Sequence, residues 1–322
     1  MTTQNPHIFV TRHIGDPALQ KLQAHFDVQV NPNNRVLTKQ EIIEGAKSAE
    51  GLLCLLTDPI DADVIKACPN LKVVSNYAVG YNNIDLDTLN EKGIALYYTP
   101  GVLTETTADL TFALILAVTR RIVEADQFTR QGKFTGWAPD MLLGSDVHGK
   151  TLGILGLGRI GLAVAKRGLG FGMRVLYTAR QDKDLPDFHF STLERLLKES
   201  DIISIHVPYS PESQHMIDEK AFGMMKKTAF LINTARGPIV DEHALVSALL
   251  SGRIAGAGLD VYEHEPTVSK ELLGLHQVVL LPHIGSATLE TRTAMGVMAA
   301  ENLIRFFSGK KHENLVNPQI FR

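Results

Sequence analysis

Short apolar runs alternate with amphipathic stretches along most of this 322-residue chain, and this alternation constrains its fold more than any other feature. In the N-terminal third, apolar runs predict strands at 7–12, 27–30, 51–56, 71–77 and 94–99. The intervening stretches predict helices near 17–25, 39–49, 60–67 and 86–91. Because strands that alternate with helices form parallel sheets covered by helices, we predict an α/β fold of doubly wound parallel sheets.

The alternation stops at a breaker cluster, Thr99-Pro100-Gly101, and residues 105–131 then predict one long helix. After a turn-rich segment, further strands are expected at 152–155, 174–179, 201–208, 229–235, 255–261 and 277–282. A last helix near 286–308 is too short to form a domain, so we expect it to cover the first sheet. Two Rossmann-like domains with a cleft between them follow: residues 1–100 plus 287–322, and an inserted domain of residues 101–286.

The composition excludes several classes of protein. The net charge is -3 without a long basic run, which argues against binding to nucleic acid or to an anionic membrane. Cys54 and Cys68 are the only cysteines, and no His/Cys cluster has metal-ligand spacing, so we expect neither disulfides nor a metal. The start lacks the features of a signal peptide, and the most apolar stretch, 110–118, is too short to cross a bilayer. We therefore predict a cytoplasmic protein.

A Gly-rich turn, GLGRIG, opens the second series of strands and helices. It follows an apolar strand and precedes a helix rich in Ala and Leu, which is the context that a dinucleotide site requires. Gly156 permits a tight turn, Gly158 lets the backbone approach a pyrophosphate, and Gly161 lets helix and strand pack closely. Anions are favoured at a helix N-terminus, here at the N–H groups of Arg159 and Ile160.

The choice of cofactor is predicted from the end of the next strand. NAD sites usually place Asp or Glu there for the ribose 2′-OH, whereas this chain has Ala179 followed by Arg180. An arginine can bind a 2′-phosphate with two hydrogen bonds, so we predict that NADP(H) is preferred and that NAD(H) is possible. The alternative is that Arg180 is a solvated loop cation.

Arg236, in INTARGP, follows a predicted strand at the sheet edge where ligands of open α/β sheets bind. A guanidinium there can clamp a carboxylate and polarise the neighbouring carbonyl, or it can simply cap the loop. His283, in LPHIG, also follows a strand, and the side-chain chemistry of histidine suits a proton donor. His206, in IHVP, is its nearest competitor among 12 histidines.

A carboxylate beside an imidazole orients it and keeps it protonated, and Glu265, in YEHEP, is the candidate for that role. Glu263 and His264 are close enough in sequence to compete for this assignment. Glu263 or Glu265 could also simply form an ion pair at the rim of the site. Asp260, in GLDVY, ends a strand at the same edge. It either binds the nicotinamide amide or caps the loop.

The chain resembles the D-2-hydroxyacid dehydrogenase family over nearly its whole length. The resemblance is carried by YAVGYNNID, GLGRIG, HVP, INTARG, GLDVYEHEP and LPHIGSAT, in the family's order and spacing. It implies that Arg236 binds substrate, that Glu265 pairs with the acid/base His283, and that backbone N–H groups of Val79 and Gly80 hold the carboxylate. The cofactor contacts that it implies are Thr106, Arg159, Ile160, Val207, Pro208, Thr234, Asp260, His283 and Gly285. The first domain would then bind substrate and the inserted one the dinucleotide.

Within that family the chain looks most like the glyoxylate/hydroxypyruvate reductase branch, on CLLTD, TPGVLTETTADL, YTARQ and SATLETR. The branch implies that Trp137 reaches the substrate pocket of a neighbouring subunit; the alternative is an anchor of the arm in its own subunit. Leu55 would line a small pocket. A homodimer is expected through the long helix and the arm around 120–146.

The predicted function is NADPH-dependent reduction of glyoxylate to glycolate and of hydroxypyruvate to D-glycerate. Two alternatives stay open from the residues: a dehydrogenase for a bulkier 2-keto acid, and a non-enzymatic, dinucleotide-sensing partner of transcription factors.

Overall fold

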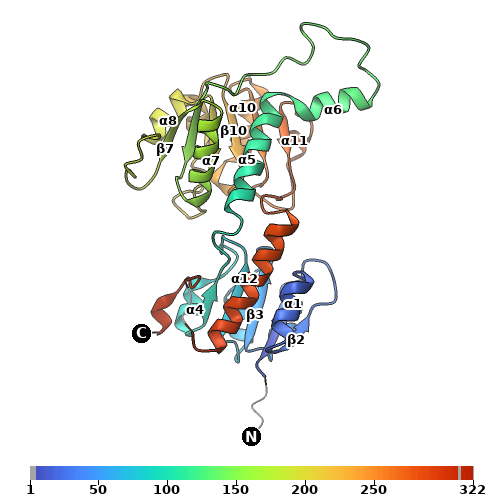
Figure 1. Cartoon of the computed structure of the whole chain (residues 1–322), viewed down its shortest axis with the longest axis vertical. Coiled ribbons are helices and arrows are strands. Elements are labelled where there is room, and N and C mark those ends of the chain that lie inside the picture. The colour runs from blue at the N-terminus through green and yellow to red at the C-terminus, as the bar shows by residue number, and fades with distance from the viewer. Residues whose placement is uncertain (1–4, 311–312, 322) are drawn as a thin grey trace. The chain divides into compact units, whose positions relative to one another are not determined.

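The computed structural model describes residues 5–310 and 313–321, and the chain divides into two compact units. Unit 1 combines Met1–Leu103 with Ser286–Arg322, and unit 2 comprises Thr104–Gly285. Each unit has its own parallel sheet with helices on both faces (Figure 1). The predicted fold class is thus confirmed.

The sheet of unit 1 has five parallel strands in the order β2-β1-β3-β4-β5. The register aligns Val10 with Leu53, Ser75 and Tyr97 across four of them. The strands are β1 (His7–Val10), β2 (Asp27–Val30), β3 (Gly51–Leu55), β4 (Val73–Tyr77) and β5 (Ala95–Tyr97). All five were predicted, because each is a short apolar run between turn residues.

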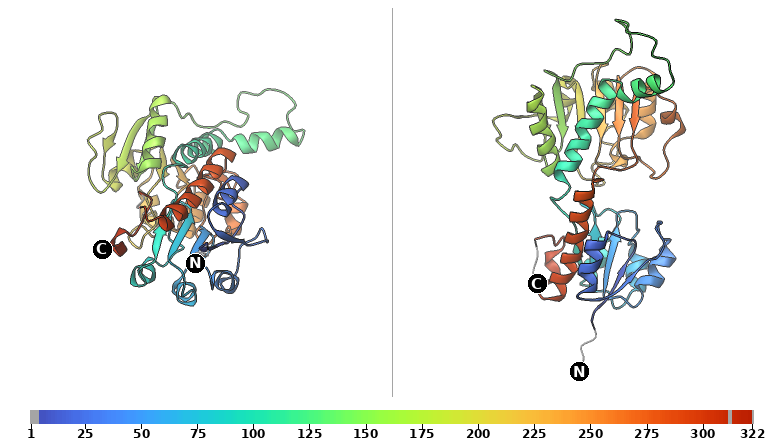
Figure 2. Two further views of the ribbon diagram at one scale, coloured as in Figure 1. Left: turned by 60° about the horizontal axis from the view of Figure 1, so that its bottom comes forward. Right: turned by 45° about the vertical axis from the view of Figure 1, so that its right-hand side comes forward.

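Alternate residues of these strands enter two separate cores. Ile8 and Val10 face α1 (Asp16–Gln23) and α12 (Leu289–Phe307), whereas Phe9 faces the opposite layer. That layer consists of α2 (Lys39–Ala46), α3 (Ala62–Ala67) and α4 (Leu86–Glu91). The last long helix therefore covers the first sheet, as predicted (Figure 2). A short 3-10 helix, η2, follows at Pro318–Phe321.

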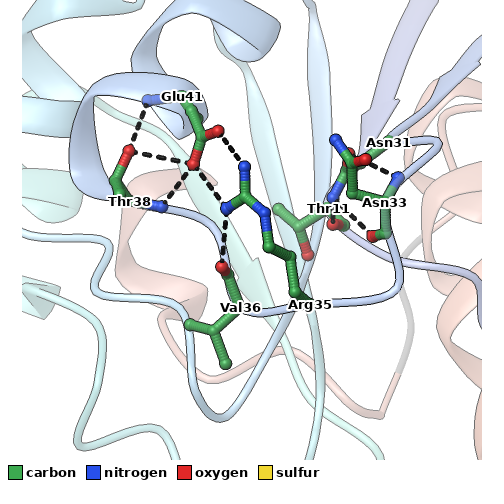
Figure 3. Close-up of polar contacts among 7 residues, drawn as sticks. All are labelled: Thr11, Asn31, Asn33, Arg35, Val36, Thr38 and Glu41. Atoms are coloured by element: carbon green, nitrogen blue, oxygen red, sulfur yellow. Dashed lines mark hydrogen bonds and ion pairs between the residues drawn. The ribbon is translucent and has the colours of Figure 1, made fainter.

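Helix α2 begins where its local sequence dictates. The Thr38 hydroxyl accepts a hydrogen bond from the Glu41 N–H, and the Glu41 carboxylate accepts one from the Thr38 N–H, which forms a capping box. Arg35 also binds the Glu41 carboxylate, and the Asn31 amide closes the preceding turn by donating to the Asn33 carbonyl (Figure 3). The start of the helix is thus determined without help from the core.

Unit 2 has seven parallel strands in the order β12-β11-β10-β9-β6-β7-β8. They are β6 (Thr151–Leu155), β7 (Arg174–Thr178), β8 (His189–Phe190), β9 (Ile202–Ile205), β10 (Phe230–Asn233), β11 (Gly256–Leu259) and β12 (Val278–Leu280). The chain runs from β6 to β7 on one side and returns to β9 on the other. This reversal of strand order makes the carboxyl end of β6 the expected ligand-binding position.

The helices of unit 2 flank this sheet, and one of them corrects the sequence prediction. Residues 105–131 form two helices, α5 (Thr104–Thr119) and α6 (Ile122–Arg130), rather than one. Arg121 adopts a left-handed conformation with φ of 53° and pairs with Glu124, which ends one helix and starts the next. Periodicity cannot reveal one left-handed residue in a polar pair such as Arg120–Arg121. The other helices are α7 (Arg159–Gly170), α8 (Leu193–Glu199), α9 (Glu219–Met224), η1 (Gly237–Ile239), α10 (Glu242–Leu250) and α11 (Lys270–Leu273).

Helix α6 and the loop after it project from the rest of unit 2 (Figures 1 and 2). No side chain of α6 is buried, whereas half of α5 is. Large apolar residues of this arm are exposed: Ile122, Val123, Phe134, Trp137 and Leu143. Trp137 is 81% exposed, so the interpretation that it anchors the arm in its own subunit is wrong.

Two further expectations concerned the cysteines and membrane-spanning helices. Cys54 and Cys68 are both buried and unpaired. Within residues 5–310 and 313–321, no helix is long and apolar enough to cross a membrane.

Candidate active site

The Gly-rich turn connects β6 to α7, and its glycines meet three different spatial demands. Gly156 has φ of 93°, and a Cβ on Gly161 would lie 2.2 Å from the Gly156 carbonyl oxygen. A Cβ on Gly158 would meet nothing within 4 Å, which leaves open space over the backbone. The first and third glycines are thus required by the fold, while the space at the second fits an approaching pyrophosphate.

Helix α7 starts at this turn without a side-chain cap. Gly158 occupies the N-cap position, so no side chain satisfies the first N–H groups, among them those of Arg159 and Ile160. By contrast, Thr192 caps α8 and Asp241 caps α10 through their side chains. An uncapped N-terminus at the switch point of the sheet fits the phosphates of a dinucleotide.

The other predicted cofactor contacts also belong to unit 2. The turn is fastened to β7, because the N–H groups of Gly156 and Leu157 donate to the Thr178 carbonyl. Just beyond, Ala179 is half-buried and Arg180 is exposed. The remaining contacts lie after β9, in α5 and after β10: Val207, Pro208, Thr106 and Thr234. A Cβ on Gly156 would lie 2.8 Å from Val207 Cγ1, so that side chain packs directly on the turn.

His283 and Glu265 form a hydrogen-bonded pair at the carboxyl edge of the same sheet. Nδ1 of His283 lies 2.8 Å from Glu265 Oε2, and the Tyr262 N–H donates to Oε1 at 3.1 Å. Burial by itself raises the pKa of Glu265, but the hydrogen bond and charge of His283, the Tyr262 N–H and the charge of Arg236 lower it below its usual value. Within the described residues Nε2 of His283 makes no hydrogen bond, so this nitrogen is available to a substrate.

The loop that carries His283 is strained and tightly held. His283 has φ of 55°, a region that non-glycine residues rarely occupy. The Asp260 carboxylate accepts hydrogen bonds from the N–H groups of Ile284 and Gly285, both at 2.8 Å. Of the two roles that the sequence left open for Asp260, loop capping is the one that these bonds describe. Its side chain is almost fully buried, and burial raises its pKa.

Arg236 follows β10 and is half-buried beside this pair. Burial lowers the pKa of its guanidinium, while the nearby charge of Glu265 raises it. The turn after it packs closely against the Glu265 loop, because a Cβ on Gly237 would lie 1.8 Å from the Tyr262 carbonyl oxygen. The fold of unit 2 therefore brings Arg236, Glu265 and His283 together.

The competing residues have other partners. Burial lowers the pKa of His206 to about 3, which disfavours the charged imidazolium, and its Nε2 lies 2.8 Å from Ser204 Oγ. Glu263 pairs with His215 at 2.6 Å instead of with His283. The sequence interpretation missed His215, Tyr262 and Gly237, and no local pattern marks them.

Leu55, Val79 and Gly80 lie at the carboxyl edge of the other sheet, in unit 1. The Asn76 amide donates to the Gly80 carbonyl at 2.9 Å, and the Asn83 amide donates to the Leu55 carbonyl at 3.1 Å. Neutral side chains thus hold the Leu55 and Gly80 loops by hydrogen bonds to their backbone carbonyl groups.

The chain is similar in sequence to known proteins. The model of the D-isomer specific 2-hydroxyacid dehydrogenase NAD binding domain matches residues 112–285. The chain is 51% identical to a glyoxylate reductase from Korarchaeum cryptofilum, over 98% of this chain and 97% of that one. It is 46% identical to a glyoxylate reductase from Thermococcus kodakarensis, over 98% of both chains.

Solved structures agree in fold. An NADPH-dependent glyoxylate/hydroxypyruvate reductase from Sinorhizobium meliloti, in complex with NADP and malonate, aligns with a TM-score of 0.88. That alignment has 33% identity and covers 97% of both chains. A glyoxylate reductase from Paecilomyes thermophila aligns with a TM-score of 0.89 and 32% identity, over 99% of this chain and 100% of that one.

Proposed function

Since the chain belongs to the D-isomer specific 2-hydroxyacid dehydrogenase family and is an NAD(P)-dependent dehydrogenase, we propose that it reduces glyoxylate to glycolate and hydroxypyruvate to D-glycerate. The observation that carries this proposal is the grouping of Arg236 with the Glu265–His283 pair at the sheet edge that also holds the uncapped N-terminus of α7. The substrates come from the glyoxylate reductases that match over nearly the full length.

The roles follow from the chemistry of each group. The cofactor, when bound, supplies a hydride to C2 of the keto acid. Arg236 binds the substrate carboxylate with its guanidinium and polarises the carbonyl beside it. His283 donates a proton from Nε2 to the oxygen that becomes the hydroxyl, while Glu265 holds Nδ1 and stabilises the charged ring. Leu55, Val79 and Gly80 as substrate contacts rest on the family resemblance alone.

The substrate is tested by a panel of glyoxylate, hydroxypyruvate, pyruvate and phenylpyruvate, each with NADPH and with NADH. We expect the highest kcat/KM for the two small substrates. A clear preference for phenylpyruvate would replace the proposal by the bulkier 2-keto acid alternative. Cofactor binding without oxidation in any of these assays would favour the non-enzymatic alternative.

We propose NADPH as the preferred cofactor because Ala179 stands where NAD sites usually have a carboxylate and Arg180 is exposed just beyond the strand to which the Gly-rich turn is bonded. Arg180→Ala should lower kcat/KM for NADPH by about tenfold, the worth of one charge-assisted hydrogen bond, and leave NADH nearly unchanged. Lys183→Ala, in the same loop, is the control and should leave both values unchanged. Equal use of both cofactors by the wild type would refute the preference.

We also propose a homodimer through the arm, supported by its exposed apolar side chains. In that assembly Trp137 contributes to the substrate pocket of the partner. Sedimentation at micromolar concentration tests the assembly, and a monomer would remove both statements. If the dimer forms, Trp137→Ala should raise KM for glyoxylate without changing KM for NADPH.

A further inference from the structure

Two carboxylate–imidazole pairs originate from one short loop, residues 262–265. Glu265 pairs with His283, and the proposed reaction uses this pair. Glu263 pairs with His215, whose Nε2 lies 2.6 Å from Oε1, and the reaction makes no use of that contact. The Glu263 side chain is the more buried of the two glutamates, at 17% exposed against 33%.

The second oxygen of Glu263 fastens the loop to α10. Oε2 accepts a hydrogen bond from the Glu242 N–H at 3.2 Å, and Glu242 Oε2 accepts one from the Glu263 N–H at 3.1 Å. Glu242 Oε1 also accepts from the Ser269 N–H at 3.3 Å. Because Asp241 already caps α10 through the Ala244 N–H, this reciprocal bonding is not needed to start the helix.

His215 fastens the same loop to the turn that follows Arg236. The His215 N–H donates to the Pro238 carbonyl at 2.9 Å, and its ring reaches Glu263 from there. Gly237 is packed so closely on the Tyr262–Glu263 peptide that a Cβ would lie 2.4 Å from the Glu263 nitrogen. The two segments therefore touch, and the His215–Glu263 contact spans their junction.

We propose that Glu263 is a positioning residue for catalysis: clasped by His215 and Glu242, it sets Arg236 and Glu265 at a fixed separation. Arg236 lies one residue before the packed glycine and Glu265 two residues after Glu263, so any slip at the junction moves both. This inference rests on the proposed roles of Arg236 and Glu265. Among the described residues, no hydrogen bond joins Glu263, His215 or Glu242 to the Gly-rich turn or to Arg180, so we expect the clasp to act on the keto acid and not on the cofactor.

The test is Glu263→Gln, which keeps the size and one acceptor oxygen but removes the charge. We expect kcat/KM for the keto acid to fall by about 10-fold to 100-fold, because misplacement of reacting groups by about an ångström can lower the rate by about 100-fold. The Kd for NADPH, measured by its fluorescence, should stay unchanged. His215→Asn should give a similar loss, because it removes the imidazole that pairs with Glu263. Asn is chosen because it accepts the left-handed backbone of His215, whose φ is 49°.

A pH profile separates positioning from mere stabilisation. The ionisable groups around Glu265 are His283, Arg236, Asp260 and Tyr262. His283 and Arg236 contribute to the lowered pKa of the Glu265 carboxyl, while burial raises it. The Glu265 carboxyl is ionised above that pKa, and its charge is lost as the pH falls through it. Loosening the clasp weakens the lowering contacts, so the acid limb of kcat/KM should move to higher pH in Glu263→Gln.

The control is Glu194→Gln, which breaks an exposed ion pair with Lys198 on α8 and should change neither rate nor pH profile. The double variant of Glu263 and His215 should lose no more than either single variant, because the two act as one unit. A Glu263→Gln protein that melts earlier but keeps wild-type kcat, KM and acid limb would overturn the proposal.

Failure of the proposed function gives a different result. If the wild type prefers another 2-keto acid, the clasp is tested on that substrate by comparing kcat/KM of the variant with kcat/KM of the wild type. If no keto acid is reduced, binding of oxamate to the NADPH complex reports on Arg236 instead. Unchanged oxamate affinity in Glu263→Gln would then refute the clasp.

Discussion

The carboxyl edges of the two parallel sheets have the same topology but different chemistry. In unit 1 the edge is shaped by neutral amides, Asn76 and Asn83, and its buried Asp58 is already bonded to Thr11 Oγ1 at 2.5 Å and to the Leu55 N–H at 2.8 Å. In unit 2 the edge carries the carboxylate of Glu265 beside the imidazole of His283. A shared fold thus presents neutral amides at one edge and a carboxylate–imidazole pair at the other.

Backbone strain follows the same division. Every non-glycine residue with positive φ in the described chain belongs to unit 2: Arg121, Leu142, Asp184, His215 and His283. Two of these are the histidines of the paired carboxylates. Strained residues persist where surrounding contacts determine them, and the bonds from Asp260 supply such contacts at the His283 loop. Among the described residues, unit 1 forms its carboxyl edge without a non-glycine residue of positive φ.

The largest expected effect comes from replacing His283, the proposed proton donor in unit 2. His283→Asn should lower kcat by about 10³-fold, within the range of general acid catalysis, because Asn accepts the left-handed backbone but carries no titratable proton. Steady-state oxidation of NADPH with glyoxylate measures kcat, and fluorescence titration should show intact NADPH binding. Turnover near the wild-type value would contradict the assignment of chemistry to this edge.

A smaller effect is expected from the packing that holds Arg236 near Glu265. Gly237→Ala places a Cβ 1.8 Å from the Tyr262 carbonyl oxygen, so one of the two segments must move. We expect kcat/KM to fall by about 100-fold and the protein to lose roughly 1–3 kcal/mol of stability, as for other overpacked sites.

The matched control is Gly223→Ala in α9, where a Cβ meets nothing within 4 Å. It should keep full activity and gain about 0.5–1 kcal/mol of stability from the better helix propensity of alanine. Thermal unfolding and kcat/KM are measured on both variants. Equal activity of the two variants would show that the junction of Gly237 with Tyr262 does not matter for catalysis.

The smallest effect is expected at the edge of unit 1. Asn83→Ala removes hydrogen bonds to the carbonyls of Leu55 and Asp58. If this edge recognises substrate through its backbone, KM for glyoxylate should rise by about 3-fold to 10-fold, equivalent to one hydrogen bond, with KM for NADPH unchanged.

Asn90→Ala is the control for that experiment, since Asn90 accepts hydrogen bonds from Asn317 and Gln319 away from the carboxyl edge. It should alter thermal stability and leave both KM values unchanged. A fall in kcat with Asn83→Ala as large as that of His283→Asn would erase the distinction between the two edges.

The sequence by itself determined the elements and their order. Apolar runs predicted the strands of both sheets except β8, whose two residues, His189–Phe190, are both exposed and so leave no periodic signal. The predicted strands placed Arg236, Glu265 and His283 after strand ends, and parallel strands bring such positions to one edge. These are local properties, so they can be read without knowing the packing.

Only the tertiary structure decided the pairings. Sequence analysis chose Glu265 as the partner of His283, but the spacing alone left Glu263, two residues away, as a competitor, because each pairing depends on a histidine from a distant segment. It joined α5 and α6 into one helix, because a single left-handed residue leaves hydrophobic periodicity almost unchanged. Local patterns report how much of a segment is buried, whereas the partner of each charged group is set by contacts between segments far apart in the chain.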